Sequence, residues 1–256
     1  MPHPYFAATG SPRVLAHRGL VTPSLAAQKI AENTLASFEA AASAGARYIE
    51  SDCHLTSDGV AVLFHDSDLR RVVGDPRAIS TVGYAQLSAL MADRGGLLTL
   101  EDALERFPST RFNLDVKAAD AAEPMGSIVA PHADRVLLTS FDERSRLAAL
   151  RAAAERGGRP ATSPGRSALI RVLLAVAAGS RRAQTRALAG LDALQIPEHH
   201  GAVRVLSPRL IDAAHSAGVE VHVWTVNEPE RMRRLVELGV DGIITDRADL
   251  ALATLR

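Results

Sequence analysis

Short apolar runs rich in Val, Ile and Leu alternate along the chain with Ala- and Leu-rich stretches of helical spacing. We predict eight strands, at residues 13–17, 48–55, 112–117, 135–141, 160–164, 193–197, 219–226 and 242–246. Helices are predicted at residues 33–44, 99–106, 142–155, 207–217 and 227–238, where Asn, Thr, Asp or Ser stands at the start as a potential N-cap. Strands that are each followed by a helical stretch predict an α/β fold, a (β/α)8 TIM barrel.

One segment interrupts this alternation. Residues 58–96, approximately, contain an SDG turn, a further short strand AVLFH and loops with the motifs DLRR and GDP. We interpret this segment as a small insertion after the second strand, and we expect it to be too short for a core of its own. The whole chain, residues 1–256, is predicted to be one barrel domain.

Composition and charge exclude several classes of function. Lys plus Arg and Asp plus Glu both number 29, and aromatic residues are only 4%. The chain therefore lacks the basic field and the stacking residues of a nucleic-acid-binding protein, and an anionic substrate must be held by a few local charges. Cys53 is the single cysteine, which excludes an internal disulfide. We see no signal peptide and no span long enough for stable membrane insertion, and we expect a cytoplasmic protein of undetermined oligomeric state.

The ionisable residues gather at the predicted C-terminal ends of strands, where a barrel builds its active site. Glu50, Asp52 and His54 are spaced by two, so they share one face of a strand, as do Asp115 and Lys117. If these faces point into the barrel mouth, three carboxylates lie together and repel one another unless a cation binds them. Ligand sets made only of oxygen favour Mg²⁺, Ca²⁺ or Mn²⁺ over zinc.

The other polar residues of these strand ends suit an anionic substrate. Arg18 and Lys117 would place two cations beside the carboxylates. His17 and His54 can exchange protons near neutral pH, as a general acid and a general base must. We interpret the set as a site for phosphoryl transfer from a phosphate ester. Trp224, the only tryptophan, is predicted to form an apolar wall of the mouth, with core packing as the alternative.

Three features remain open from the residues alone. Glu32 stands beside a potential helix cap and could instead reach Arg18 or a metal. His65 is followed by Asp66, and we favour a structural role for the pair over direct catalysis. The basic run that contains Arg181 and Arg182 is interpreted as a solvated helix face, with attraction to an anionic membrane surface as the alternative.

The motifs together resemble the glycerophosphodiester phosphodiesterase family. They are HRG (17–19), ENT (32–34), ESDCHLTSDG (50–59), HD (65–66), VWTVN (223–227) and GIITD (242–246), and they occur in the order typical of that family. The resemblance implies a TIM barrel with a small insertion after strand two. It also implies hydrolysis of a glycerophosphodiester to glycerol 3-phosphate and an alcohol, with a bound divalent cation.

The resemblance further implies roles for individual residues. Glu50 and Asp52 would bind the metal, His17 and His54 would be the acid and base in an undetermined order, and Arg18 and Lys117 would hold the phosphate. A glycerol hydroxyl would attack phosphorus and form a cyclic phosphate, which water would then open. Asp115 stands where the third metal ligand of the family is commonly Glu, and the segment 20–31 is long enough to shape the substrate entrance.

Functions other than hydrolysis of water-soluble diesters make different demands on the sequence. A lysophospholipase D would need an apolar groove, to which residues 169–178 could contribute. A phosphate lyase would stop at the cyclic phosphate. A barrel that only binds a phosphorylated ligand is disfavoured, because both histidines and all three carboxylates are present.

Overall fold

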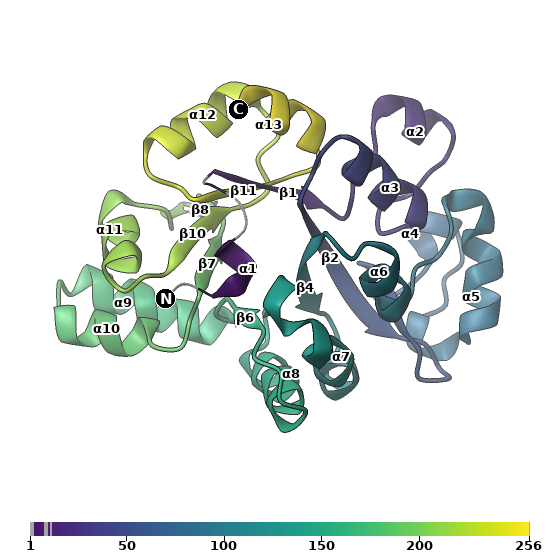
Figure 1. The fold of residues 1–256 in the computed structure, drawn as a ribbon, viewed down its shortest axis with the longest axis horizontal. Coiled ribbons are helices and arrows are strands. Elements are labelled where there is room, and N and C mark those ends of the chain that lie inside the picture. The colour runs from purple at the N-terminus through teal and green to yellow at the C-terminus, as the bar shows by residue number, and fades with distance from the viewer. Residues whose placement is uncertain (1–2, 8–9, 11, 256) are drawn as a thin grey trace.

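Eight parallel strands surround one axis and helices cover them on the outside (Figure 1). The computed structural model describes residues 3–7, 10 and 12–255, so the predicted domain limits at residues 1 and 256 lie outside the described residues. The barrel strands are β1 (Arg13–His17), β2 (Tyr48–Leu55), β4 (Arg111–Val116), β5 (Val136–Thr139), β6 (Ala161–Thr162), β7 (Ala193–Ile196), β10 (Glu220–Val223) and β11 (Gly242–Thr245). All eight predicted barrel strands, and the predicted fold class, are confirmed.

The barrel is nearly closed. The strands follow one another in the hydrogen-bonded order β6-β5-β4-β2-β1-β11-β10-β7. The remaining gap, between β6 and β7, is bridged by Asp192, whose backbone N–H donates to the carbonyl of Thr162 at 2.9 Å. The carboxylate of Asp192 accepts the backbone N–H of Thr162 at 3.0 Å in return. One residue thus joins the two strands where the ladder is interrupted.

The outer helices pack their apolar sides on the barrel, and the predicted Thr99, Asp142 and Ser207 each cap a helix with their side chains. The outer α-helices are α3 (Leu35–Ser43), α6 (Leu100–Arg106), α7 (Ala122–Val129), α8 (Glu143–Glu155), α9 (Arg166–Ala177), α10 (Arg181–Leu188), α11 (Pro208–Ser216), α12 (Pro229–Glu237) and α13 (Ala248–Thr254). Single 3₁₀ turns occur at Ile79–Thr81, Ala92–Arg94, Ala119–Ala121 and Ala130–Arg135.

The predicted cap of α3 was wrong by one residue. Thr34, not Asn33, is the N-cap, and it forms a capping box with Ser37. Asn33 precedes the cap in a left-handed conformation with φ of 56°. Its side chain is therefore available for other contacts.

The insertion follows β2 as predicted and begins with the predicted short strand, β3 (Ala61–Leu63), which pairs antiparallel with β2. It continues with α4 (Arg70–Val73) and α5 (Tyr84–Met91). Seven buried apolar residues of the insertion form a cluster separate from the barrel core: Val62, Phe64, Leu69, Ile79, Val82, Leu87 and Met91. Since Ala31 and Leu97 also pack on this cluster, the short insertion gains apolar partners from its neighbours.

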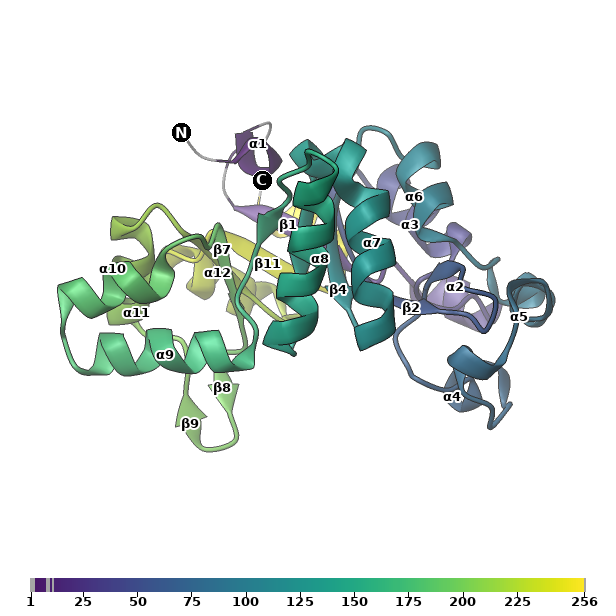
Figure 2. The same ribbon diagram turned by 90° about the horizontal axis from the view of Figure 1, so that it is seen from below.

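The two ends of the barrel carry different structures (Figure 2). At the C-terminal ends of the strands lie α2 (Pro23–Ala27), α4 and a hairpin of β8 (His199–His200) and β9 (Val203–Arg204). At the opposite end lies α1 (Pro4–Ala7), whose Tyr5 and Phe6 are buried against inward-facing residues of six strands: Leu15, Tyr48, Leu137, Ala161, Ala193 and Ile244. In the described part of the chain, no helix combines the length and apolar character needed to cross a membrane.

A polar network lies next to the part of the barrel interior that α1 fills. Arg13 donates two hydrogen bonds to Glu220, at 2.7 and 2.8 Å, and a third to the hydroxyl of Tyr48. His222, fully buried, lies 3.0 Å from the same carboxylate. Burial alone would raise the pKa of Glu220, but Arg13 and His222 lower it to about 2. His222 is therefore a structural residue of the barrel interior.

We expect Tyr5→Ala to destabilise the protein by about 3 kcal/mol or more, because it empties the space between α1 and the barrel interior. Tyr5 is fully buried and its ring meets that of Tyr48 edge to face at 5.2 Å. Urea unfolding at neutral pH measures the loss. The half-buried Tyr84 provides the control, since Tyr84→Ala should cost less. An equal loss of unfolding free energy in the two variants would contradict the conclusion that α1 fills this end of the barrel interior.

Candidate active site

The predicted polar residues of β1, β2 and β4 meet at the C-terminal end of the barrel. His17 is in register with Glu50, and Asp52 is in register with Asp115. Alternate residues of a strand share a face, so the inward face of β2 places Glu50 and Asp52 side by side between the two neighbouring strands. The three carboxylic residues are buried, with exposures of 7% for Glu50, 1% for Asp52 and 5% for Asp115.

Asp52 is the most heavily contacted of these carboxylates. Lys117 Nζ lies 2.8 Å from Asp52 Oδ1, and Arg18 Nε lies 3.1 Å from Asp52 Oδ2. Burial alone would raise the pKa of Asp52, but these two cations outweigh it and lower the pKa below its usual value. Lys117 also contacts Asp115 at 2.6 Å, yet burial dominates there and raises the pKa of Asp115. Lys117 thus bridges two of the predicted metal ligands.

The backbone conformation of the HRG turn directs the side chain of Arg18 toward the carboxylates. Arg18 and Gly19 both have positive φ, 57° and 88°. A Cβ atom at Gly19 would lie 2.5 Å from the Ser37 hydroxyl and 2.8 Å from the Ser37 backbone, so only glycine fits. The strained conformation of Arg18 is held by its backbone N–H, which donates to the carbonyl of Glu50 at 2.8 Å and to Glu50 Oε2 at 3.2 Å.

Asn33 is a site residue that our sequence analysis assigned to a helix cap. Its Nδ2 donates to Asp52 at 3.1 Å, and its Oδ1 accepts the hydroxyl of Ser51 at 2.7 Å. The amide therefore fixes the orientation of Asp52. The ENT motif marked the position, but the left-handed backbone that turns Asn33 inward leaves no pattern in the sequence.

His17 is held between two carboxylates. Its Nδ1 donates to Asp246 at 2.6 Å, and its Nε2 lies 3.8 Å from Glu50. Burial lowers the pKa of His17, but Asp246 and Glu50 together outweigh burial and raise it. Asp246 is anchored by Asn227 Nδ2 at 2.8 Å. Asn227 and Asp246 are the last residues of the VWTVN and GIITD motifs, and the sequence alone indicated no role for either.

His54 lies in a different environment, near the end of β2. Its Nε2 donates to the backbone carbonyl of His65 at 3.2 Å. Burial lowers the pKa of His54, with only partial opposition from this carbonyl. The side chain of His65 pairs with Asp66 at 2.7 Å. His65 thus supports His54 through its backbone, in agreement with the structural role that we favoured.

A chain of ion pairs links the insertion to the HRG turn. Arg71 of α4 contacts Asp66 at 2.6 Å and Glu32 at 2.7 Å, and Glu32 contacts Arg18 at 2.8 Å. Glu32 therefore positions Arg18, one of the alternatives left open by the sequence. The insertion and the phosphate-binding candidate are joined by side chains rather than by the barrel alone.

Glu50 is the carboxyl of the cluster whose ionised form is least compensated by neighbouring groups. Burial, together with the charges of Asp52 and Asp115, raises its pKa to about 8, against the opposing effects of His17 and Arg18. One carboxylate oxygen of Asp115 is buried without a hydrogen-bond partner. As the described side chains stand, no three acidic, imidazole or thiol groups converge on one point as a metal would require. The donor set nevertheless suits a hard cation, because its groups are oxygens and its surplus charge is negative.

Trp224 and Phe141 form the apolar side of the mouth. Their rings meet edge to face at 6.0 Å, and the ring of Phe141 lies 5.6 Å from Lys117 Nζ. Trp224 also packs against the interior cluster of the barrel. Trp224 therefore contacts both the interior cluster and the exposed Phe141, and its role as a wall for the substrate stays a prediction.

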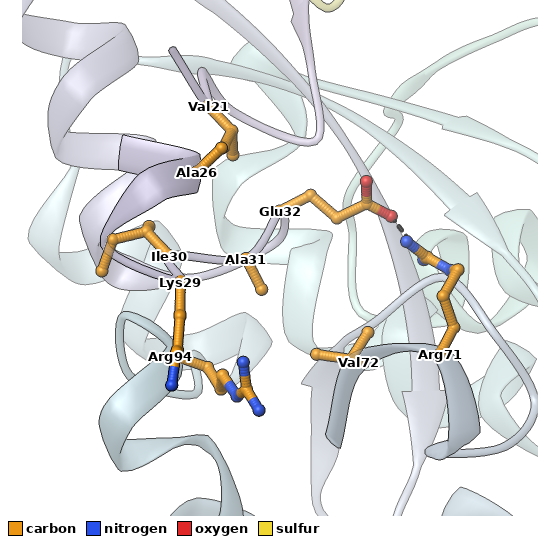
Figure 3. Close-up of a pocket in the computed structure, with 9 residues that line it drawn as sticks. All are labelled: Val21, Ala26, Lys29, Ile30, Ala31, Glu32, Arg71, Val72 and Arg94. Atoms are coloured by element: carbon orange, nitrogen blue, oxygen red, sulfur yellow. Dashed lines mark hydrogen bonds and ion pairs between the residues drawn. The ribbon is translucent and has the colours of Figure 1, made fainter. Parts of the chain in front are cut away.

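A hollow lies beside the site, between residues 20–31 and the insertion (Figure 3). Glu32 and Arg71 pair at one side of it, and Lys29 and Arg94 lie together at the other. Val21, Ala26, Ile30, Ala31 and Val72 complete its lining. The long segment after the HRG turn thus helps to shape a hollow that reaches the site through Glu32.

The motif residues are therefore assembled as one site at the expected end of the barrel. The family model of the glycerophosphoryl diester phosphodiesterase family matches residues 17–250. The chain belongs to this family. Its fold, its motifs and its class of reaction, hydrolysis of phosphoric diesters, are those of a glycerophosphodiester phosphodiesterase.

Individual relatives agree with this assignment. A probable glycerophosphodiester phosphodiesterase 2 from Mycobacterium tuberculosis is 39% identical over 96% of this chain and 91% of its own length. A lysophospholipase D from Rattus norvegicus is 23% identical over 91% of this chain and 83% of its own. The crystal structure of a glycerophosphodiester phosphodiesterase from Thermotoga maritima aligns with a TM-score of 0.70 at 26% identity, covering 95% of this chain and 97% of that one.

We expect the stability of the metal-free glycerophosphodiester phosphodiesterase to fall between about pH 4.5 and pH 8 because of Glu50. Over this range the folded protein keeps a proton that the unfolded chain, with an ordinary Glu pKa of 4.5, releases. The loss is at most about 1.4 kcal/mol per pH unit. Glu50→Gln removes the titrating group and should flatten the decline.

Urea unfolding in a chelating buffer at several pH values measures this effect. The exposed carboxyl of Glu39 gives the control, since Glu39→Gln should keep the wild-type slope. A Glu50→Gln variant with an unchanged slope would show that Glu50 ionises normally.

Proposed function

We propose that the protein hydrolyses glycerophosphodiesters to glycerol 3-phosphate and an alcohol with the aid of a divalent cation bound by Glu50, Asp52 and Asp115. One observation carries this proposal: three buried carboxylates, two cations and two imidazoles meet at the C-terminal end of the barrel. With all three carboxylates ionised, as metal ligands would be, Arg18 and Lys117 reduce their combined charge to one negative charge. A divalent cation changes this to one positive charge, which a phosphodiester monoanion balances.

The cation would act as a Lewis acid that offsets charge developing on the phosphoryl oxygens and lowers the pKa of a nearby hydroxyl. Mg²⁺ and Ca²⁺ are the ions favoured by the all-oxygen donor set, and Mn²⁺ is a third candidate. Lys117 now lies between Asp52 and Asp115, so cation binding and the position of Lys117 are coupled.

Arg18 and Lys117 are the proposed phosphate ligands. Both already lie against carboxylates, at 3.1 and 2.8 Å from Asp52, which fixes their heads inside the site. Arg18 suits two-point contact with phosphate, and Lys117 supplies a point charge. Trp224 and Phe141 offer an apolar surface to the glycerol or the alcohol. The partner is thus a small-molecule phosphodiester.

The two histidines have environments that favour opposite roles. His17 contacts Asp246 at 2.6 Å and lies 3.8 Å from Glu50, and two carboxylates favour its protonated form. We assign it as the general acid that donates a proton to the leaving alcohol. His54 contacts a neutral carbonyl through Nε2, which leaves Nδ1 unprotonated. We assign it as the general base that takes a proton from the attacking hydroxyl.

Lysophospholipase D activity is the alternative, and a relative with that name supports it. The apolar wall of Trp224 and the exposed Phe141 would then contact an acyl chain or its glycerol. A cytoplasmic location remains a prediction made from the sequence.

We expect His17→Ala and His54→Ala each to reduce turnover of glycerophosphocholine by roughly 10²-fold or more, since proton transfer by a positioned side chain contributes about that factor. Release of glycerol 3-phosphate, followed by phosphorus NMR, measures turnover. His215→Ala is the control, because His215 pairs with Asp241 away from the site. Wild-type turnover in either site variant would refute the acid–base assignment.

We expect turnover to disappear in a chelator and to return with Mg²⁺, Ca²⁺ or Mn²⁺. The same NMR assay should be run with glycerophosphocholine, glycerophosphoethanolamine and lysophosphatidylcholine. Preference for the first two supports glycerophosphodiester hydrolysis, whereas turnover of lysophosphatidylcholine alone supports the lysophospholipase D alternative. Undiminished turnover in a chelator would overturn the proposed metal site.

A further inference from the structure

The charges of this neutral chain are unevenly distributed. Residues 156–191 contain seven arginines and neither Asp nor Glu, although Lys plus Arg and Asp plus Glu are equal over the whole chain. Five of these arginines are exposed on α9 and α10: Arg166, Arg171, Arg181, Arg182 and Arg186. None of the five forms an ion pair with another described residue. This surface therefore carries positive charge that the fold itself does not use.

Helix α9 also exposes large apolar side chains among these charges. Ile170 is 49% exposed and Leu174 is 65% exposed. They are four residues apart, so they lie on one stripe of the helix, in line with Arg166 and next to Arg171. The other side of α9 is anchored, because Ala168, Val172, Ala175 and Val176 are buried. The outer face of a firmly packed helix is thus both basic and apolar.

This face is joined to the mouth of the active site. The backbone N–H of Arg166 donates to the carbonyl of Phe141 at 3.0 Å, so the exposed ring of Phe141 belongs to the residue next to the start of α9. The same ring lies beside Trp224 and Lys117. Exposed apolar side chains therefore occur both at the mouth, in Phe141, and on the helix that begins beside it, in Ile170 and Leu174.

The β8–β9 hairpin adds to the same end of the molecule. Its Val203 is 63% exposed and Arg204 is exposed beside it. Figure 2 shows α9 and this hairpin at the end of the barrel where α4 also lies, opposite α1. The candidate catalytic residues lie at the same end, where the barrel strands terminate. A flat partner that covers α9 and the hairpin would face the mouth.

We propose that this α9 face, made of Arg166, Ile170, Arg171 and Leu174 with Val203 and Arg204 of the hairpin, docks on the surface of an anionic lipid bilayer. Arg204 donates to the backbone carbonyl of Leu206, but no ion pair neutralises the arginines of this face among the described residues. They complement acidic headgroups, and apolar side chains between them enter the interfacial region. A second copy of the chain fits poorly, because a two-fold contact would set the same arginines against one another. The docking brings the mouth to a surface that holds phospholipid-derived diesters, and in this respect it rests on the proposed function.

Sedimentation with vesicles tests the proposal without turnover. The vesicles are phosphatidylcholine alone, or phosphatidylcholine with roughly one-third phosphatidylglycerol. We expect binding to the anionic vesicles at low salt, weak binding to the neutral ones, and loss of binding as salt is raised. Arg166→Gln with Arg171→Gln should weaken binding roughly tenfold or more. Ile170→Ser with Leu174→Ser should weaken it as well.

Two variants of α12 are matched controls. Arg233→Gln with Arg234→Gln removes two exposed arginines, and Leu238→Ser removes an exposed leucine, on another side of the barrel. Both controls should bind vesicles like the wild type. Circular dichroism melts check folding. If the apolar double variant is unstable, the surface arginine pair still decides the question.

Three results would overturn the proposal. They are no binding to anionic vesicles at low salt, equal binding by the α9 variants, and a dimer in sedimentation velocity that Ile170→Ser with Leu174→Ser dissolves. The failures are distinguishable from those of the proposed function. Vesicle binding without hydrolysis of any diester refutes only the proposed reaction, and hydrolysis of glycerophosphocholine without vesicle binding refutes only the docking.

Discussion

The buried carboxylate of Asp52 is the interaction on which the site is built. A charge at 1% exposure is costly unless cations and hydrogen-bond donors surround it, and here they come from three separate segments. The HRG turn supplies Arg18, the residue before α3 supplies Asn33, and the end of β4 supplies Lys117. Asp52 is thus the one side chain that these three segments contact in common.

The carboxylate site and the packing that stabilises the barrel lie at opposite ends of the barrel. At the end occupied by α1, aromatic packing and the satisfied Arg13–Glu220 network fill the interior. At the opposite end, Glu50 and Asp115 remain imperfectly compensated, with a pKa of about 8 for Glu50 and an unpaired oxygen on Asp115. The packed end at α1 offsets the cost of the imperfectly compensated carboxyls at the other end. The surplus negative charge is then available for a ligand rather than being neutralised by the fold.

Periodicity predicted the strands and the inward faces of Glu50, Asp52 and Asp115, because a spacing of two is set by backbone geometry alone. It did not predict the roles of Asn33 and Asp246. Asn33 turns inward through a left-handed backbone, and Asp246 finds His17 only because β11 pairs with β1 across the closing barrel. The apolar cluster of the insertion was likewise not predicted, because Ala31 and Leu97, which pack on it, lie outside the segment 58–96. Contacts between distant segments leave little local pattern.

Lys117 connects the inner and outer parts of the site. Its ammonium touches Asp52 and Asp115, and the same group lies 5.6 Å from the ring of Phe141. Phe141 in turn accepts the first backbone N–H of α9 through its carbonyl. Any ligand that displaces Lys117 from the carboxylates therefore also changes the position of its ammonium relative to the Phe141 ring. Occupancy of the carboxylate cluster and the shape of the substrate entrance are physically coupled through this one side chain.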